Sequence, residues 1–211
     1  MGNIYVSPGN RKLGGIPSIS LDPRRTCVSD ITCRQKCYAM RMMRFRNNIK
    51  VSWERNTQVW NNEPDGYFRQ LRQWIDKHNP PYFRFHVGGD IPNIRYFLFM
   101  ADLADQTPNT KYLCFTKRYT GMGQYIETMR EGLDNVRLLL SAWPFQIPEH
   151  EFLFNVCAHE SRKMPNKIAV SWIDDDPRVD TMAYKPTLCK NNCSICHACW
   201  ESDGDIILHK H

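Results

Sequence analysis

Four cysteines near the C-terminal end of the chain are the residues whose spacing most directly indicates chemistry. They form one C-x3-C-x2-C-x2-C run, made of Cys189, Cys193, Cys196 and Cys199. Iron–sulfur clusters take four thiolate ligands from compact runs of this kind. Structural zinc sites also use four cysteines, but usually as two C-x2-4-C pairs with a longer stretch between them. The spacing therefore favours a 4Fe-4S cluster, with zinc as the alternative metal.

A second group of three cysteines lies near the other end of the chain. Cys27, Cys33 and Cys37 form a C-x5-C-x3-C pattern that is followed by Tyr38. A cluster held by three thiolates leaves one iron open to a substrate or cofactor, whereas a cluster with four protein ligands mostly transfers electrons or stabilises the fold. The alternative is that Cys27 and Cys33 pack as ordinary buried thiols. Their polar, arginine-rich surroundings favour metal binding over a place in the core.

The remaining cysteines and the absence of a leader bear on the cellular compartment. Cys114 and Cys157 each lie inside an apolar run, so we expect both to pack in the core. The total of nine cysteines is odd, the chain opens without an apolar signal segment, and no apolar stretch is long enough to span a membrane. These features predict a cytoplasmic, reducing location, where grouped cysteines usually serve metal binding or catalysis.

The charge of the chain is unevenly distributed. With 211 residues, 42% hydrophobic residues and a net charge of +6, the composition is that of one globular domain. Residues 1–50, however, hold ten Lys or Arg against only Asp22 and Asp30. This basic excess could attract nucleic acid, or it could offset the negative charge of a thiolate-bound cluster. The aromatic residues of this region that could stack on bases are Tyr38, Phe45 and Trp53.

Strand-like and helix-like segments alternate through the middle of the chain. The strands are expected at residues 15–21, 82–87, 111–116, 136–141, 152–157 and 167–173. The helices are expected at residues 68–75, 93–105 and 123–131. This alternation predicts an α/β fold with about six parallel strands joined by crossover helices, as an open sheet or a partial barrel. The composition then changes near Asp174, which predicts a metal-ordered extension over 174–211 within the same globular unit as residues 1–173.

Polar residues follow two neighbouring strands of the predicted sheet, at the ends where parallel folds collect their functional groups. Gly88, Gly89 and Asp90 follow one strand, and Lys117 follows the next. The glycine pair would let a ligand approach the backbone, and Asp90 would accept a hydrogen bond from an amine. His86, inside the first of these strands, is expected to be a hydrogen-bonded strand residue rather than a ligand.

Five short segments, in this order, resemble the bacteriophage gene product 88 family. They are TCVSDITCRQKCYA, FRFHVGGD, NTKYLCFTK, NVRLLLSAW and CSICHACW. Members of that family show a C-x5-C-x3-C-Y-A segment, an R-x-H-x-x-G-D segment, a Y-T-K segment and often a C-x2-C-x2-C-W ending. The resemblance runs from about Thr26 to Trp200 and implies a phage protein that acts in the cytoplasm of an infected bacterium.

The gene product 88 family is in turn similar to radical S-adenosylmethionine (radical SAM) enzymes. Their core is a six-stranded partial TIM barrel with a three-cysteine loop after the first strand and a G-G-E type segment after the second. This chain departs from that pattern in three places. Its cysteine loop is wider than the usual C-x3-C-x2-C, its aromatic residue Tyr38 follows the third cysteine, and Asp90 replaces the glutamate. These departures weaken the expectation of radical chemistry more than the expectation of the fold or of cluster binding.

The resemblance assigns roles residue by residue. A 4Fe-4S cluster with one open iron would be held by Cys27, Cys33 and Cys37. A cofactor such as S-adenosylmethionine would be contacted by Gly88, Gly89, Asp90, Tyr38 and Lys117. An auxiliary cluster would be held by Cys189, Cys193, Cys196 and Cys199.

The sequence as a whole therefore predicts an iron–sulfur protein with a radical-SAM-like partial barrel and one or two 4Fe-4S clusters. Whether it is an enzyme is left open. Two alternatives remain. One is a non-catalytic module braced by zinc or iron–sulfur that binds nucleic acid through its basic N-terminal third. The other is a one-electron carrier that exchanges electrons with a redox partner through the C-terminal cysteines.

Overall fold

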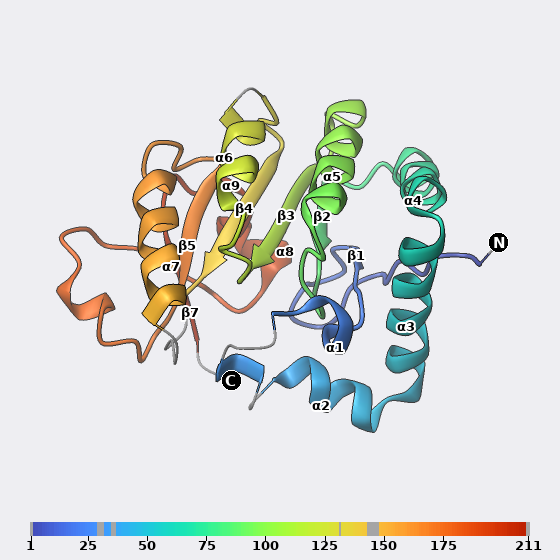
Figure 1. Ribbon diagram of the computed structural model, residues 1–211, viewed down its shortest axis with the longest axis horizontal. Coiled ribbons are helices and arrows are strands. Elements are labelled where there is room, and N and C mark those ends of the chain that lie inside the picture. The colour runs from blue at the N-terminus through green and yellow to red at the C-terminus, as the bar shows by residue number, and fades with distance from the viewer. Residues whose placement is uncertain (1, 29–31, 35–36, 131, 143–147, 210–211) are drawn as a thin grey trace.

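The centre of the protein is an open, parallel, seven-stranded sheet (Figure 1). The structure is a computed structural model, and it describes residues 2–28, 32–34, 37–130, 132–142 and 148–209. The strands are β1 (Ser18–Ile19), β2 (Tyr82–Phe85), β3 (Lys111–Thr116), β4 (Val136–Ser141), β5 (Ile168–Ile173), β6 (Thr187–Leu188) and β7 (Ile206–Leu208). Their order is β1-β2-β3-β4-β5-β7-β6, and every neighbouring pair is parallel. The first five strands therefore lie side by side in chain order.

Helices join consecutive strands of this sheet. The long connection from β1 to β2 contains α1 (Pro23–Thr26), a 3-10 turn (Thr32–Arg34), α2 (Tyr38–Phe45), α3 (Asn47–Asn62) and α4 (Pro64–His78). The next three connections contain α5 (Ile94–Gln106), α6 (Met122–Arg130) and α7 (Pro148–Ser161). Parallel crossovers are almost always right-handed, so strands added in one direction place their helices on one face. Figure 1 shows α5, α6 and α7 together on one side of the sheet.

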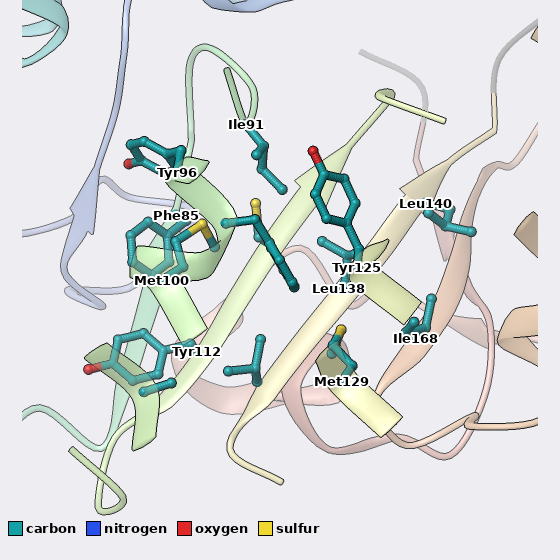
Figure 2. Close-up of a cluster of buried hydrophobic side chains, with 14 of the residues drawn as sticks. Phe85, Ile91, Tyr96, Met100, Tyr112, Tyr125, Met129, Leu138, Leu140 and Ile168 are labelled. Atoms are coloured by element: carbon teal, nitrogen blue, oxygen red, sulfur yellow. The ribbon is translucent and has the colours of Figure 1, made fainter. Parts of the chain in front are cut away.

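Apolar side chains from alternate strand positions pack against these helices. Figure 2 shows Tyr112, Leu138 and Ile168 of three neighbouring strands facing Met100 of α5 and Met129 of α6. All five side chains belong to one buried cluster. Because side chains alternate between the two faces of a strand, the residues in between point to the other side of the sheet.

The C-terminal segment covers that second face. Leu113, Leu139 and Ala169 belong to a separate buried cluster with Trp200, which lies in the short helix α9 (Ala198–Glu201). The indole Nε1 of Trp200 donates a hydrogen bond to the carbonyl of Phe83 at 3.3 Å. The predicted extension 174–211 thus adds two strands and a layer of buried side chains to the same sheet.

Local sequence signals explain where the helices begin and end. Asn93 precedes α5, and its side chain accepts a hydrogen bond from the backbone N–H of Tyr96 at 3.0 Å. Helix α4 begins at Pro64, where the missing N–H costs nothing, and is followed by Asn79 in the left-handed conformation. The predicted helices at 68–75 and 93–105 are confirmed. The helix predicted at 123–131 is α6, and its last expected residue, Glu131, lies outside the described residues.

The strand predicted at residues 152–157 is wrong, because this segment lies inside the helix α7. Phe154 is buried in the core, whereas Phe152 and Val156 are exposed apolar residues on the outer side of the helix. Apolar residues on both sides of a short helix hide its period, and such a run cannot be distinguished from a buried strand by pattern alone.

The predicted parallel α/β fold is confirmed, but the predicted count of six strands is not. Of the six expected strands, five coincide with strands of the sheet, although only Ser18 and Ile19 of the segment 15–21 are extended in it. The remaining two strands, β6 and β7, come from the extension. The sheet is not closed, since β1 and β6 form its two edges. Across the described ranges, no helix combines the length and apolar character that a membrane crossing requires.

We predict that Trp200→Ala destabilises the protein strongly. The substitution removes a large, buried side chain that attaches the C-terminal segment to the sheet, and such truncations cost about 3–5 kcal/mol. Urea unfolding of the metal-free protein measures the loss. Ile195→Ala in the same segment is the matched control, because Ile195 is 76% exposed and should change stability by less than about 0.5 kcal/mol. Equal unfolding midpoints for the two variants would contradict the packing described here.

Candidate functional site

The three cysteines of the first group lie on the connection that leaves the carboxyl end of β1. Cys27 follows α1, Cys33 lies in the 3-10 turn, and Cys37 immediately precedes α2. All three side chains are partly exposed and none is in a disulfide. Because β1 pairs with β2 in parallel, this connection starts beside the carboxyl end of β2.

The ionisation of these three thiols is coupled. Burial raises the pKa of Cys27, the negative charge of Asp90 raises it further, and the charges of Cys37 and Cys33 act in the same direction. Burial also raises the pKa of Cys33. The positive charge of Lys117 lowers this pKa, and the negative charge of Cys37 raises it. Such mutual effects require the groups to lie near one another. In the metal-free protein Cys27 and Cys33 are therefore protonated at neutral pH, and a metal would displace their protons on binding.

Asp90 is turned into the protein, and its side chain is only 4% exposed. Its Oδ1 accepts hydrogen bonds from Thr116 Oγ1 and from the N–H of Ile91, both at 2.7 Å, and its Oδ2 accepts from the N–H of Lys117 at 2.9 Å. These bonds tie the end of β2 to the end of β3. An amine that used Asp90, as the sequence predicts, would have to share the carboxylate with these three donors.

The two glycines before Asp90 are required by packing within the protein itself. A Cβ atom on Gly88 would lie 2.3 Å from Cζ3 of Trp53. Gly89 has φ +87°, and a Cβ atom there would lie 2.7 Å from the carbonyl oxygen of Leu21. These glycines, expected from the sequence to admit a ligand, admit Trp53 of α3 and the backbone of Leu21 after β1.

Tyr38 and Lys117 complete the group of predicted residues at this end of the sheet. The hydroxyl of Tyr38, at the start of α2, donates a hydrogen bond to the carbonyl of Val87. Lys117 holds Asp90 through its backbone, and its charge acts on Cys27 and Cys33. The structure therefore brings together, at the carboxyl ends of β1, β2 and β3, the residues Cys27, Cys33, Cys37, Tyr38, Gly88, Gly89, Asp90 and Lys117.

His86 differs from its prediction as a hydrogen-bonded strand histidine. Its side chain is 3% exposed, and neither ring nitrogen has a hydrogen-bond partner among the described residues. Its backbone is left-handed at φ +59°, and its ring lies 5.3 Å from that of Tyr96 on the helical face. Burial, with the charge of Arg84, lowers the pKa of His86 to about 3, so the ring is neutral. No local sequence signal distinguishes this histidine from an ordinary strand residue.

The four cysteines of the second group lie on the face of the sheet opposite to helices α5, α6 and α7. Cys189 follows β6, Cys193 and Cys196 begin and end the short helix α8 (Cys193–Cys196), and Cys199 lies in α9. Burial raises the pKa of Cys199, and the charges of Cys189, Cys193 and Cys196 raise it further. The four thiols therefore lie in one region of the protein, near enough to affect the ionisation of Cys199. The group lies near the start of β2, where the rings of Tyr82 and His197 stack at 4.2 Å.

Arg84 is a positive charge near Tyr38 and near the second cysteine group. Its guanidinium lies 4.7 Å from the centre of the Phe115 ring, on the face that α8 and α9 cover. Its charge opposes the rise in pKa that burial causes at Tyr38, beside the first group, and at Cys193 and Cys199 in the second. Sequence reasoning missed Arg84, because its place depends on how the C-terminal segment folds back over β2.

The donor sets suit thiophilic metals, although the side chains do not form a finished coordination shell. In the part of the chain that the structure describes, no three His, Cys, Asp or Glu side chains stand close enough together to hold a metal ion. In number, three cysteines match a cluster that keeps a free iron, and four cysteines match a closed cluster or a zinc ion. Metal binding would require the side chains of each group to move closer together.

A cavity of about 670 Å³ lies apart from both cysteine groups. It is bounded by the end of α7, by β5 and by the connection from β5 to β6, which contains only the 3-10 turn Val179–Thr181 where earlier crossovers carry a full helix. Its lining includes Trp172, Arg178 and Tyr184 and none of the predicted site residues.

An open parallel sheet with helices on one face, and with two cysteine groups at separate places on it, defines a cysteine-rich α/β protein. The family model of gene product 88 matches residues 6–202, and the chain belongs to this family. The motif resemblance to that phage family is thereby confirmed. No curated protein and no solved structure matches the chain. The similarity to radical SAM enzymes is not part of what these comparisons show.

We predict that Asp90→Ala destabilises the metal-free protein by about 1–3 kcal/mol. The substitution leaves the hydroxyl of Thr116 and the N–H of Lys117 buried without their acceptor, which carries a cost of this size. Chemical unfolding followed by circular dichroism measures it. Asp105→Ala, on the exposed side of α5, removes the same charge where no partner is lost and serves as the control. Equal stabilities would mean that Asp90 does not hold the strand ends together.

Proposed function

We propose that this protein binds two iron–sulfur clusters. The first would be a 4Fe-4S cluster held by Cys27, Cys33 and Cys37 with one iron open. The second would be a closed 4Fe-4S cluster held by the four C-terminal cysteines. The observation that supports the proposal is the placement of three free cysteines on the connection that leaves the carboxyl end of β1, next to Asp90 and Lys117 at the ends of β2 and β3.

The arrangement of the sheet supports a radical-SAM-like partial barrel. Strands β1 to β5 follow one another in chain order, as they do in a TIM barrel, and their connecting helices lie on one face. In such folds the reactive groups collect at the carboxyl ends of the strands, where the first cysteine group lies. The second face of the sheet, which would be the interior of a barrel, is filled here by α8, α9 and Arg84.

This chain's residues have distinct parts in the proposed site. A bound 4Fe-4S cluster would supply one-electron reduction at an iron that the protein leaves open. Lys117 places a positive charge beside thiolates that are costly to bury, and thereby favours their ionised form. Asp90 fixes the loop on which Lys117 lies. S-adenosylmethionine is the cofactor that the family resemblance proposes for the open iron, with the Gly88–Gly89 turn next to it.

A reducing compartment suits this proposal. All nine cysteines are free, and the grouped thiols of each site remain available as ligands. We propose that the protein acts in the cytoplasm of an infected bacterium. Zinc in the four-cysteine group is the alternative. The colour of the purified protein and an analysis of its metal content distinguish zinc from an iron–sulfur cluster.

We predict that the two sites load independently. Cys193→Ala with Cys196→Ala should remove about half of the iron and sulfide measured in anaerobically reconstituted protein, because one four-iron cluster uses four ligands. Replacing Cys27, Cys33 and Cys37 by alanine should remove the other half. Cys114→Ala is the control, since this thiol is buried in the helical core and should leave the iron content unchanged. Loss of all iron from a folded single-site variant, or zinc in place of iron, would contradict the proposal.

We predict that S-adenosylmethionine binds at the open iron. The test is made in the Cys193→Ala/Cys196→Ala variant, so that only the first cluster contributes a signal. Its reduced electron paramagnetic resonance spectrum should shift when the cofactor is added, because a ligand at an iron changes the electronic environment of that iron. S-adenosylmethionine added to metal-free protein supplies the blank. An unchanged spectrum with an intact cluster would contradict binding of S-adenosylmethionine, although the protein could still bind iron–sulfur clusters.

A further inference from the structure

Helix α2 and the first half of α3, residues 38–55, form a positively charged surface that we call the basic arm. Its five cations lie at exposed or partly exposed positions and are Arg41, Arg44, Arg46, Lys50 and Arg55. Against them stands a single carboxylate, that of Glu54, which pairs with Arg24 outside the arm. None of the five cations forms an ion pair with an acidic side chain of the described residues.

Exposed aromatic rings accompany these charges. Tyr38 is 47% exposed at the start of α2, and Phe45 is 73% exposed at its end. Together with Arg41 they occupy positions i, i+3 and i+7, so the three side chains share one face of the helix. Large exposed rings next to unpaired cations are a feature of surfaces that bind single-stranded nucleic acid, where bases stack on rings and phosphates meet cations.

The third aromatic residue expected to contact nucleic acid, Trp53, is not available for it. Its ring lies against Gly88 and is buried with Ala39 and Met43 on the inner side of the arm. Trp53 therefore attaches the arm to the body of the protein. The outer side carries the charges and the ring of Phe45, whereas the partly exposed ring of Tyr38 directs its hydroxyl to the carbonyl of Val87. In Figure 1, α2 lies at the lower edge of the molecule, away from the sheet.

The charges of the arm are directed to solvent and pair with no carboxylate of the described residues. Arg41 and Arg44 lie further along α2 and point to its exposed side. Of the two explanations for the basic N-terminal region, an external anionic partner therefore fits the exposed cations of the arm.

We propose that the basic arm binds single-stranded nucleic acid and holds it beside the three-cysteine group. The rings favour a single strand over a duplex, whose bases are already stacked. They also favour nucleic acid over an anionic lipid surface, because the arm presents two rings among five cations and no continuous apolar face. The bound strand would lie beside the three-cysteine group because Cys37 directly precedes α2 and the hydroxyl of Tyr38 donates a hydrogen bond to the carbonyl of Val87.

Binding of a fluorescein-labelled oligo-dT strand, measured by anisotropy over a salt series with full-length protein, tests this proposal. Arg41→Glu with Arg44→Glu should weaken binding at least about tenfold and reduce the magnitude of the salt slope by about 1.4, the value for two phosphate contacts. Phe45→Ala should weaken binding about tenfold with little change in salt slope, because stacking carries no charge. Phe45→Trp should keep the affinity.

Lys77→Glu with Arg130→Glu is the matched control. This variant makes the same change in net charge at exposed positions of α4 and α6, away from the arm. Once the general effect of net charge is subtracted, its affinity should lie within about twofold of that of the unsubstituted protein. Equal losses in the arm and control variants would overturn the proposal. So would tighter binding to duplex DNA of the same length, or binding to anionic vesicles without binding to the oligonucleotide. Metal-free and metal-loaded protein are compared, so a failure of cluster binding remains distinguishable from a failure of the arm.

Discussion

The carboxylate of Asp90 is the interaction on which the geometry of the first cysteine group depends. Three donors from the ends of β2 and β3 hold it, and the N–H of Asp90 in turn donates to Thr26 Oγ1 at 3.2 Å. Thr26 directly precedes Cys27, so this network positions the cysteine connection relative to two strands. Burying the carboxylate raises its pKa, and the hydrogen bonds oppose that rise. A buried acid is tolerated at this place because each donor it satisfies would otherwise be unpaired at the end of a strand.

The open sheet gives the two cysteine groups different surroundings. The first lies at the carboxyl ends of the strands, partly exposed and beside charged loops. The second is packed against the face of the sheet, where Cys189 and Cys199 are buried. Arg84 lies on the face of the second group, and its charge acts on Cys193 and Cys199. Its Nε atom is buried without a hydrogen-bond partner in the described residues. Negative charge gained by the second group would therefore lie near a guanidinium that has an unused donor in the part of the chain that the structure describes.

Much of this fold follows from local sequence, and the exceptions have physical causes. Strands β3 to β5 have six residues each and are mostly buried, and β2 has four residues that alternate in burial, so their patterns identify them. Strands β6 and β7 have two and three residues, too few for a pattern, and exist because the C-terminal segment returns to the edge of the sheet. The grouping of cysteines in sequence predicts their grouping in space. The inward turn of Asp90 and the place of Arg84 depend on contacts between distant segments, which spacing does not encode.

His86 shows how one backbone angle divides the roles of neighbouring residues. Its left-handed conformation interrupts the alternation of β2, so its ring packs beside Tyr96 on the helical face and Val87 packs toward the other cluster. The carbonyl of Val87 is then placed to accept the hydroxyl of Tyr38, which connects α2 to the sheet. A buried imidazole nitrogen without a partner costs about 1–3 kcal/mol, and neither nitrogen of His86 has one among the described residues. This cost falls directly before the glycine turn, at the residue whose backbone places Val87 to accept the hydroxyl of Tyr38.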